Sequence, residues 1–414
     1  MKIAAFVVEY NPFHNGHKYH LEESIKLTGA THTIAIMSGS FVQRGEPSLV
    51  DKWTKAKMAI ENGIDLVIEL PFIYSCQSAE LFAHGAVHIM NSLNIVDYIC
   101  FGSELDDIKS IDKISKILLE EPREFKEHLK RYLSKGHSFP QSRSLALIDY
   151  LQHDPLDSCQ DYKNILKQSN NILAIEYLKA LHRLKSKIQP ICIGRVGSSY
   201  NDESLNMKFS SATAIRKAIF NSGLSSVESE IPCESFRILE KFYNQYKMFN
   251  SMENYFSILR YLITAYEPDE LLNYFDVDSG LTNRIKQQLE RSYDMDCLID
   301  NISTKRYPKT RIKRILVHIL NRLYRDKIIE LYENPPSYIR ILGSNENGFS
   351  LIRKISESSP ITIINRFSDH KKYTDKYMKN FIYHEKKATD IYFLGLNKPI
   401  SNMDYIISPY IKKI

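Results

Sequence analysis

The sequence predicts an α/β fold in which a parallel sheet is covered by helices, followed by a mainly helical region and a small α/β tail. Two patterns support this prediction. Short apolar runs alternate with longer stretches of helical periodicity through about residue 101, which is typical of parallel strands buried on both faces. Beyond about residue 230, helical periodicity replaces this alternation.

The elements of the first half follow one another in regular order. Apolar runs predict strands at residues 2–9, 33–37, 65–70, 96–101 and 190–195. Helical spacing predicts helices at 16–27, 49–62 and 77–92, mainly helices over 105–185, and one more from about Ser211. Each predicted strand up to residue 101 is thus followed by a helix that can return the chain to the same edge of the sheet.

The second half is expected to be mostly helical. Helices are predicted at 234–246, 251–266, 282–293 and 311–332, and strands at 361–364 and 390–394. We therefore expect three parts: a catalytic domain at 1–230, a basic helical domain at 231–335, and a small α/β region at 336–414.

Composition and charge narrow the class of protein. The chain has 414 residues, 43% hydrophobic and 25% charged, and no apolar run long enough to span a membrane. Its six cysteines form no CxxC pair, which favours reduced thiols and a cytoplasmic protein without a zinc site. Residues 1–230 hold 26 basic and 27 acidic residues, against 29 and 22 in the remainder, so the second half is expected to meet a polyanion.

The strongest functional signal is a His-Asn-Gly-His motif between the first predicted strand and helix. His14 and His17 lie three residues apart, at the carboxyl end of a strand, where doubly wound sheets bind ligands. The helix that follows offers free N–H groups to phosphate, and Gly16 leaves room for a flat base. A chance loop or a pair of metal ligands is the alternative, but no neighbouring cluster of carboxylates or cysteines completes a metal shell.

A second signal follows the strand predicted at 190–195. Ser210 or Ser211 can cap the next helix, and Thr213 and Arg216 lie on its first turns. Hydroxyls, N–H groups and a guanidinium in this arrangement suit a phosphate chain. Taken alone, an ordinary helix cap is the simpler interpretation; together with the histidine motif, a phosphate site is favoured.

These two motifs resemble the HxGH and SSxTxIR motifs of the nucleotidyltransferase superfamily, which has a Rossmann-like fold. The segments FVVEYNPFHNGHKYH, MSGSFVQRGEP, DLVIELPF, FGSE and SNNILAIEYLKAL resemble the bacterial tRNA(Met) cytidine acetate ligase family along the whole chain. The resemblance implies that ATP activates acetate to acetyladenylate, and that the acetyl group passes to the wobble cytidine of elongator tRNA(Met), giving N(4)-acetylcytidine. A small-molecule adenylyltransferase without an RNA substrate is the alternative.

The site residues follow from the motifs and the resemblance. We expect His14 and His17 to stabilise charge on the α-phosphate, and Ser211, Thr213 and Arg216 to hold pyrophosphate. The resemblance places ATP along Val7, Val8, Glu9, Tyr10, Asn11, Pro12, Phe13, His14, Asn15, Gly16, His17, Lys18, Tyr19 and His20, and adds Gly102, Arg195 and either Asn170 or Asn171. Arg44, Asp51 and Lys52 either orient acetate or phosphate, or belong to an ordinary solvated loop with a helix cap. Mg²⁺ is expected to arrive with ATP, without a dedicated metal site.

A basic stripe in the second half predicts RNA contact. On one continuous helix, Arg311, Arg314, His318, Arg322 and Arg325 would fall within about 80° of the helical circumference. Acidic residues are almost absent around them, so we expect this face to bind the phosphate backbone of tRNA rather than form an ordinary solvated surface.

Overall fold

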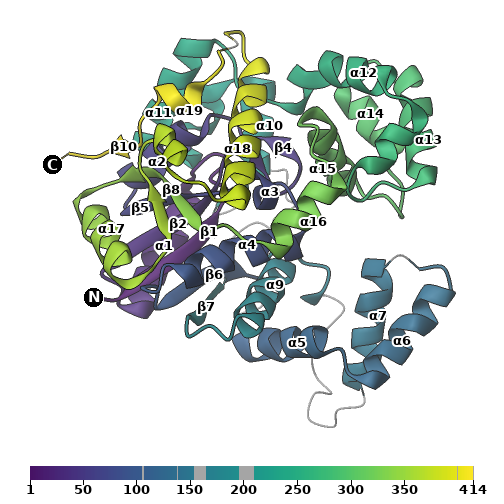
Figure 1. The fold of residues 1–414 in the computed structure, drawn as a ribbon, viewed down its shortest axis with the longest axis horizontal. Helices are drawn as coiled ribbons and strands as arrows, with labels where there is room; N and C mark the ends of the chain where they lie inside the picture. Colours follow the sequence, from purple (N-terminus) through teal and green to yellow (C-terminus); the bar gives the residue numbers. More distant parts are fainter. Residues whose placement is uncertain (105–106, 138, 153–164, 195–208, 399, 414) are drawn as a thin grey trace.

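The computed structural model of the chain describes residues 1–414 except 105–106, 138, 153–164, 195–208, 399 and 414. A twisted sheet forms its centre, with strand order β10-β8-β5-β2-β1-β6-β7 and with β9 paired to β8 (Figure 1). The strands are β1 (Ile3–Val8), β2 (His32–Ser38), β5 (Leu66–Leu70), β6 (Tyr98–Ser103), β7 (Gln189–Gly194), β8 (Tyr338–Ser344), β9 (Thr362–Ile364) and β10 (Tyr410–Ile411). The predicted α/β class is confirmed.

The five strands from β5 to β7 form the parallel part of the sheet. β1 pairs with β2 on one side and with β6 on the other, so the strand order reverses at β1. Phe6 of β1 and Ile34 and Ile36 of β2 are almost fully buried, which explains their continuous apolar runs. A reversal of strand order opens a crevice beyond the carboxyl ends of the strands, and the histidine motif follows β1 there.

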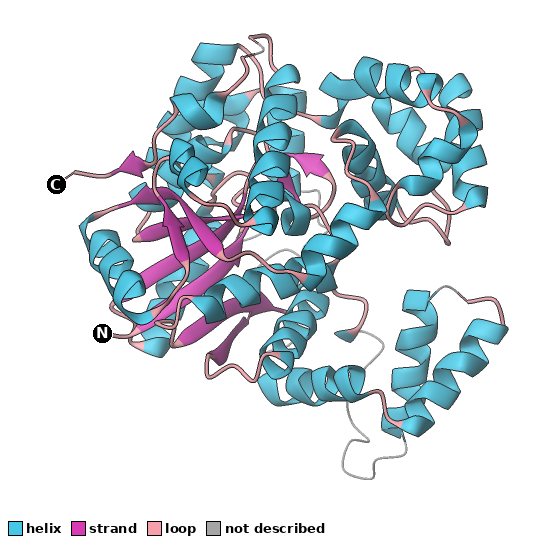
Figure 2. Ribbon diagram, viewed as in Figure 1, coloured by secondary structure: helices cyan, strands magenta, loops and turns pink. Residues whose placement is uncertain are grey.

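Helices cover both faces of this sheet, as the alternation in the sequence predicts (Figure 2). The helices of the first half are α1 (Asn15–Thr28), α2 (Lys52–Glu61), α3 (Phe72–Ser75), α4 (Ala79–Ser92), α5 (Ile108–Glu120), α6 (Arg123–Ser134), α7 (Phe139–Gln152), α9 (Ser169–Arg183) and α10 (Ala212–Ser222). A short hairpin, β3 (Phe41–Val42) with β4 (Glu46–Pro47), follows β2. The predicted helix at 49–62 begins only at Lys52, because Asp51 caps it.

Residues 231–335 are helical, as predicted. They form α11 (Cys233–Tyr246), α12 (Phe256–Ala265), α13 (Ser279–Arg291), α14 (Met295–Ile302), α15 (Lys309–Leu320) and α16 (Arg325–Glu333), joined in part by 3-10 turns. The prediction of one helix over 311–332 is wrong. The chain leaves the helix at 321–324, where Arg322 has a left-handed φ of 45°, and α16 starts only at Arg325.

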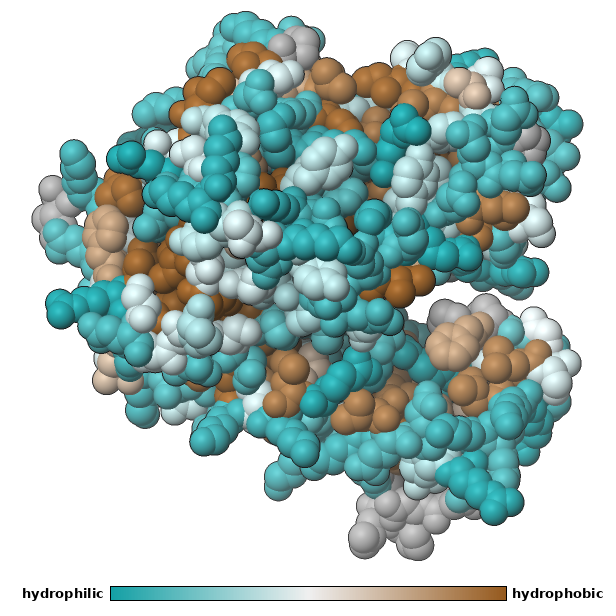
Figure 3. Space-filling view, viewed as in Figure 1, coloured by the Kyte–Doolittle hydropathy of each residue, from teal (hydrophilic) through white to brown (hydrophobic). Residues whose placement is uncertain are grey.

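The helical part and the α6–α7 pair form two lobes on the same side of the molecule (Figure 1). The space-filling view shows the surface hollowed between these lobes (Figure 3). No described helix combines the length and the apolar character needed to cross a membrane.

The C-terminal residues complete the sheet. β8 pairs antiparallel with β5, and α17 (Glu346–Ser358) packs against the same strands. The strand predicted at 361–364 is confirmed as β9, whereas 390–394 lies in α18 (Lys376–Leu394), whose buried Tyr392 and Phe393 gave the apolar signal. A short α19 (Met403–Ile406) follows. Residues 336–414 therefore share one sheet with the first part, and the proposed three-part division remains a prediction.

A buried ionic cluster joins this C-terminal part to the front of the chain. Lys52 Nζ lies 2.7 Å from Glu69, 2.8 Å from Asp404 and 3.3 Å from Glu385. Arg340 contacts Glu69 at 3.1 Å and pairs with Asp404. All five side chains are nearly inaccessible to water. Removing one charged side chain from such a cluster strongly destabilises the fold, because an unpaired charge would remain buried.

Candidate functional site

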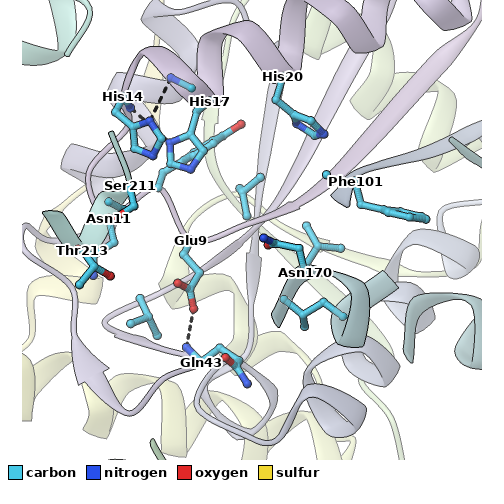
Figure 4. Close-up of a pocket in the computed structure, with 18 of the residues that line it drawn as sticks. Glu9, Asn11, His14, His17, His20, Gln43, Phe101, Asn170, Ser211 and Thr213 are labelled. Atoms are coloured by element: carbon cyan, nitrogen blue, oxygen red, sulfur yellow. Dashed lines mark hydrogen bonds between the residues drawn. The ribbon is translucent and has the colours of Figure 1, made fainter. Parts of the chain in front are cut away.

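A pocket opens beyond the carboxyl ends of β1 and β6 (Figure 4). Its lining comes from the end of β1 and the start of α1 with the loop between them, from the β3–β4 hairpin, α4 and α9, from β6 and β7, and from the start of α10. It is lined by Val7, Val8, Glu9, Tyr10, Asn11, His14, Gly16, His17, Tyr19, His20, Val42, Gln43, Arg44, Glu46, Phe82, Cys100, Phe101, Gly102, Asn170, Leu173, Tyr177, Ile193, Gly194, Phe209, Ser210, Ser211, Ala212, Thr213 and Arg216. Both sequence motifs thus meet in one cavity.

The two histidines are held by backbone N–H groups at the start of α1. Nδ1 of His14 accepts a hydrogen bond from Gly16 N at 3.1 Å, and Nδ1 of His17 accepts one from His14 N at 3.3 Å. The centroids of the two imidazole rings lie 3.7 Å apart. Because each Nδ1 acts as an acceptor, the proton of each neutral ring belongs on Nε2. The histidine motif therefore offers N–H donors to a ligand in the pocket.

Gly16 serves this arrangement in a different way from that predicted. A Cβ at this position would lie 2.9 Å from Cε1 and 3.1 Å from Nδ1 of His14. The space left by the missing side chain is therefore filled by the imidazole of His14, while Gly16 itself lines the pocket. Gly16 acts by allowing the His14 ring to fold back over the helix terminus.

The start of α10 brings the second motif to the same end of the pocket (Figure 4). Ser211 caps the helix, its hydroxyl accepting from Ala214 N at 3.0 Å. Arg216 donates to Asn11 O at 2.8 Å and to Glu46 Oε2 at 2.9 Å. Within the described part of the chain, the buried Asn11 Nδ2 and Ser210 Oγ have no hydrogen-bond partner. Polar atoms of this kind suit a phosphate ligand.

The floor of the pocket is formed by Glu9 and the β3–β4 hairpin. Oε1 of Glu9 accepts from Gln43 N at 2.7 Å, and burial raises the pKa of this carboxyl, although Arg44, Arg216 and Lys55 oppose the shift. Below it, Lys55 Nζ donates to Ser38 O at 2.7 Å and Gly39 O at 2.9 Å, and burial lowers its pKa to about 7. Lys55 Nζ also donates to Glu9 O at 3.1 Å, so it ties the ends of β1 and β2 together beneath the site.

Asn170 and Asn171 take different roles, which the sequence left open. Asn170 lines the pocket, and its amide donates to Glu104 Oε1 at 2.6 Å. Asn171 is buried, and its Oδ1 accepts from Ser103 Oγ and from Glu104 N. Asn171 therefore braces the end of β6, and Asn170 is the one available to a ligand. Gly102, expected in a loop, lies inside β6.

Some predicted site residues do not line the pocket. Pro12 and Phe13 are buried beneath the motif, Asn15 binds Ser229 O with its amide, and Lys18 is exposed. Asp51 caps α2 by accepting from Thr54 N, and Lys52 lies in the buried ionic cluster. Their charges are satisfied by internal partners, so only Arg44 of the three acetate or phosphate candidates faces the cavity. Arg195 lies outside the described residues.

Several lining residues were not predicted. They are Val42, Gln43, Glu46, Phe82, Cys100, Phe101, Leu173, Tyr177, Ile193, Gly194, Phe209, Ser210 and Ala212. Most are apolar, and in sequence they are indistinguishable from core residues of the same strands and helices. Phe209 was detectable in principle, because it directly precedes the serine motif. Its ring stacks on that of Tyr19, with the ring centroids 5.2 Å apart. Figure 4 places Phe101 and Asn170 on the side of the pocket away from His14 and His17.

The predicted RNA-binding stripe is only partly exposed. Arg311 donates to Asp276 O at 2.5 Å, and His318 is buried with Nε2 2.9 Å from Cys76 O. Arg314 is partly buried, while Arg322 within the helix break and Arg325 at the start of α16 are exposed. Arg325 also donates to the carbonyls of Tyr274 and Val277. The structure therefore does not place these side chains on one continuous helical face.

Comparison with known proteins shows the family to which this chain belongs. A family model described as HIGH Nucleotidyl Transferase matches residues 1–404. A tRNA(Met) cytidine acetate ligase of Clostridium perfringens (strain SM101 / Type A) is 43% identical over 99% of this chain and 100% of its own length. One from Thermoanaerobacter sp. (strain X514) is 44% identical over the full length of both. The chain belongs to the tRNA(Met) cytidine acetate ligase family of HIGH nucleotidyltransferases.

Solved structures of this family support the architecture. The apo crystal structure of Thermotoga maritima TmcAL has a TM-score of 0.94 to this chain, at 31% identity, and 99% of each chain is covered. A second crystal form of TmcAL, bound with alpha-thio ATP, has a TM-score of 0.92 at the same identity and coverage. The three-dimensional arrangement of this chain is thus that of an acetate ligase family member known to bind an ATP analogue.

Proposed function

We propose that this chain uses ATP and acetate to acetylate the wobble cytidine of elongator tRNA(Met). An acetate oxygen attacks the α-phosphorus, the bond to the β-phosphate oxygen breaks, and pyrophosphate leaves. The exocyclic amine of cytidine then attacks the acetyl carbonyl, AMP leaves, and the amine loses one proton. The product is N(4)-acetylcytidine, formed in the cytoplasm, where tRNA and ATP are both present.

The orientation of the two imidazoles carries this proposal. With Nδ1 of His14 and His17 accepting backbone N–H groups, both Nε2–H groups are preorganised as donors. Negative charge builds on the α-phosphate oxygens as acetate adds, and fixed donors stabilise that charge without reorganisation. The N-terminus of α1 adds a favourable dipole. No side-chain nucleophile is required.

The start of α10 would hold the pyrophosphate. Ser211, Thr213 and Arg216 lie at the histidine end of the pocket, and Ser210 contributes an unpaired hydroxyl. We place the adenosine toward Phe101, Gly102 and Asn170, where the lining is mostly apolar. Mg²⁺ is expected to arrive with the nucleotide and to neutralise part of the phosphate charge. Arg44 is the residue we propose to orient acetate.

Acetate dependence tests this function. ATP and acetate without tRNA should give a burst of pyrophosphate, and addition of tRNA(Met) should make AMP formation continuous. A small-molecule adenylyltransferase would show no response to acetate. Pyrophosphate release that is independent of acetate, or acetylation that does not depend on ATP, would contradict the proposal.

A further inference from the structure

Three charged side chains connect the helical part of the chain to the nucleotide pocket. Lys313 Nζ on α15 lies 2.5 Å from Oε1 of Glu46 on β4. The second carboxylate oxygen, Oε2 of Glu46, lies 2.9 Å from Nη2 of Arg216 on α10. Each carboxylate oxygen thus takes one cation, and both Glu46 and Arg216 line the pocket.

The backbone of α15 is packed directly against this hairpin. A Cβ on Gly45, whose φ is +78°, would lie 2.2 Å from the backbone N of Arg314 and 2.5 Å from the carbonyl carbon of Lys313. Only glycine allows this approach. The position of Lys313 relative to Glu46 is therefore fixed by main-chain contact and not only by a flexible side chain.

We propose that Lys313 is a positioning residue of the ATP site, acting through Glu46 on Arg216. This inference rests on the proposed function only in that the pocket takes the triphosphate of ATP. The helical part of the chain then completes the phosphate site electrostatically, although none of its residues lines the pocket.

The charges explain why the lysine is needed. Burial alone would raise the pKa of Glu46, but Arg216 and Lys313 lower it to about 2, so this carboxylate is ionised at every physiological pH. Arg216, Glu46 and Lys313 together present a net charge of +1 to an incoming triphosphate. Without Lys313 the net charge is zero, and Glu46 competes with the phosphates for the Arg216 guanidinium.

Binding of ATP and of adenosine to the full-length chain, without acetate or tRNA, tests the inference. Lys313→Met should weaken ATP binding about fivefold, the effect of a partly exposed ion pair of roughly 1 kcal/mol. Adenosine carries no phosphate, so its affinity should change less than twofold. Lys313→Arg should restore ATP binding. The matched control is Lys309→Met on the same helix, since Lys309 pairs with Asp300 at 2.5 Å outside the pocket.

Two results would overturn the inference. ATP affinity in Lys313→Met equal to that of Lys309→Met would show that the lysine has no effect on the site. An equal loss of ATP and adenosine affinity would show that it only packs α15 against the hairpin. A wild-type chain that binds ATP but releases no pyrophosphate with acetate would refute the proposed function while leaving this inference intact.

Discussion

His14 serves both folding and chemistry, and a choice of substitutions separates the two. Its ring caps α1 and is only 7% exposed, so a change at this position affects folding as well as the ligand site. Loss of a helix cap costs about 0.5–2 kcal/mol. Asn accepts the same backbone N–H but cannot place an imidazole Nε2–H in the pocket.

We therefore expect His14→Asn to keep the melting temperature near that of wild type and to lower acetyladenylate formation roughly a hundredfold, the loss typical of one oxyanion donor. His14→Ala should lose both activity and stability, and His17→Ala should lose activity. Acetate-dependent pyrophosphate release and thermal unfolding measure the two effects. Wild-type turnover in His14→Asn would refute the assignment.

Acetate itself offers little binding energy, which makes size selection testable. Its four heavy atoms can contribute at most about 1.5 kcal/mol each, so affinity should be weak. Each additional methylene changes binding in an apolar pocket by about 1–3 kcal/mol. Propionate should be activated poorly and butyrate hardly at all, as measured by pyrophosphate release over a series of short carboxylates. An equal response up to long chains would exclude acetate as the preferred substrate.

Sequence reasoning found pocket-lining residues where neighbours along the chain define their position. His14, Gly16 and His17 form their contacts within four residues, and Ser211 caps its own helix. It failed for Lys52, which follows the second strand as a substrate-binding residue would. The partners of Lys52 are Glu69, Glu385 and Asp404. Glu385 and Asp404 lie more than 300 positions from Lys52, and no local sequence pattern predicts contacts over such a separation.

At the scale of elements, the break between α15 and α16 changes which arginines can reach RNA. Arg322 sits in the break and is exposed, and its guanidinium donates two hydrogen bonds to the hydroxyl of Tyr324. Arg311 and Arg314 are partly buried, so reversing their charge would disturb packing as well as any RNA contact. The proposal of tRNA binding by Arg311, Arg314, Arg322 and Arg325 is therefore best tested at Arg322.

Arg322→Glu should weaken tRNA binding and reduce by about one the slope of log affinity against log salt, as expected for one phosphate contact. Acetyladenylate formation without tRNA should be unchanged, because Arg322 does not line the pocket. Filter binding over a range of salt concentrations measures the slope. Exposed Arg353, on α17, provides the control as Arg353→Glu. Equal tRNA affinity in both variants would show that Arg322 is only a solvated residue.

The helix break could not be predicted from periodicity. Residues 311–332 keep an apolar repeat across 321–324, because Leu323 is buried even though it lies outside both helices. Strands were predicted well where helices separate them in sequence. The assignment of 390–394 to a strand failed because a short apolar run, without its surroundings, fits a buried helix equally well.

At the scale of the whole molecule, the buried ionic cluster makes stability depend on pH. Burial and the neighbouring Glu69 raise the pKa of Glu385 to about 8, so the folded chain holds a proton that the unfolded chain releases near pH 4.5. The contribution of Glu385 to the free energy of unfolding is fully present below about pH 4.5. It is lost as the pH rises toward 8, by at most about 1.4 kcal/mol per pH unit.

Glu385→Gln should remove this dependence, since its amide can donate toward Glu69 as the protonated acid does. The free energy of unfolding of wild type relative to Glu385→Gln should therefore fall between about pH 5 and pH 8. The comparison with the variant is needed because Lys55, whose pKa burial lowers to about 7, acts in the opposite direction. Glu357→Gln, at an exposed pair with Arg353, is the control. A difference that does not vary with pH would mean that Glu385 is ionised in the folded chain.

The antiparallel pairing of β8 with β5 has a consequence for synthesis on the ribosome. Synthesis of β5 is complete once residue 70 has been added. Its antiparallel partner β8, residues 338–344, is made some 270 residues later. At about 5–20 residues per second, that edge waits on the order of 15 to 50 seconds. An open strand edge is a template for pairing with other chains. During synthesis the nascent protein therefore passes through a period in which this edge of β5 is not yet covered by its partner strand β8.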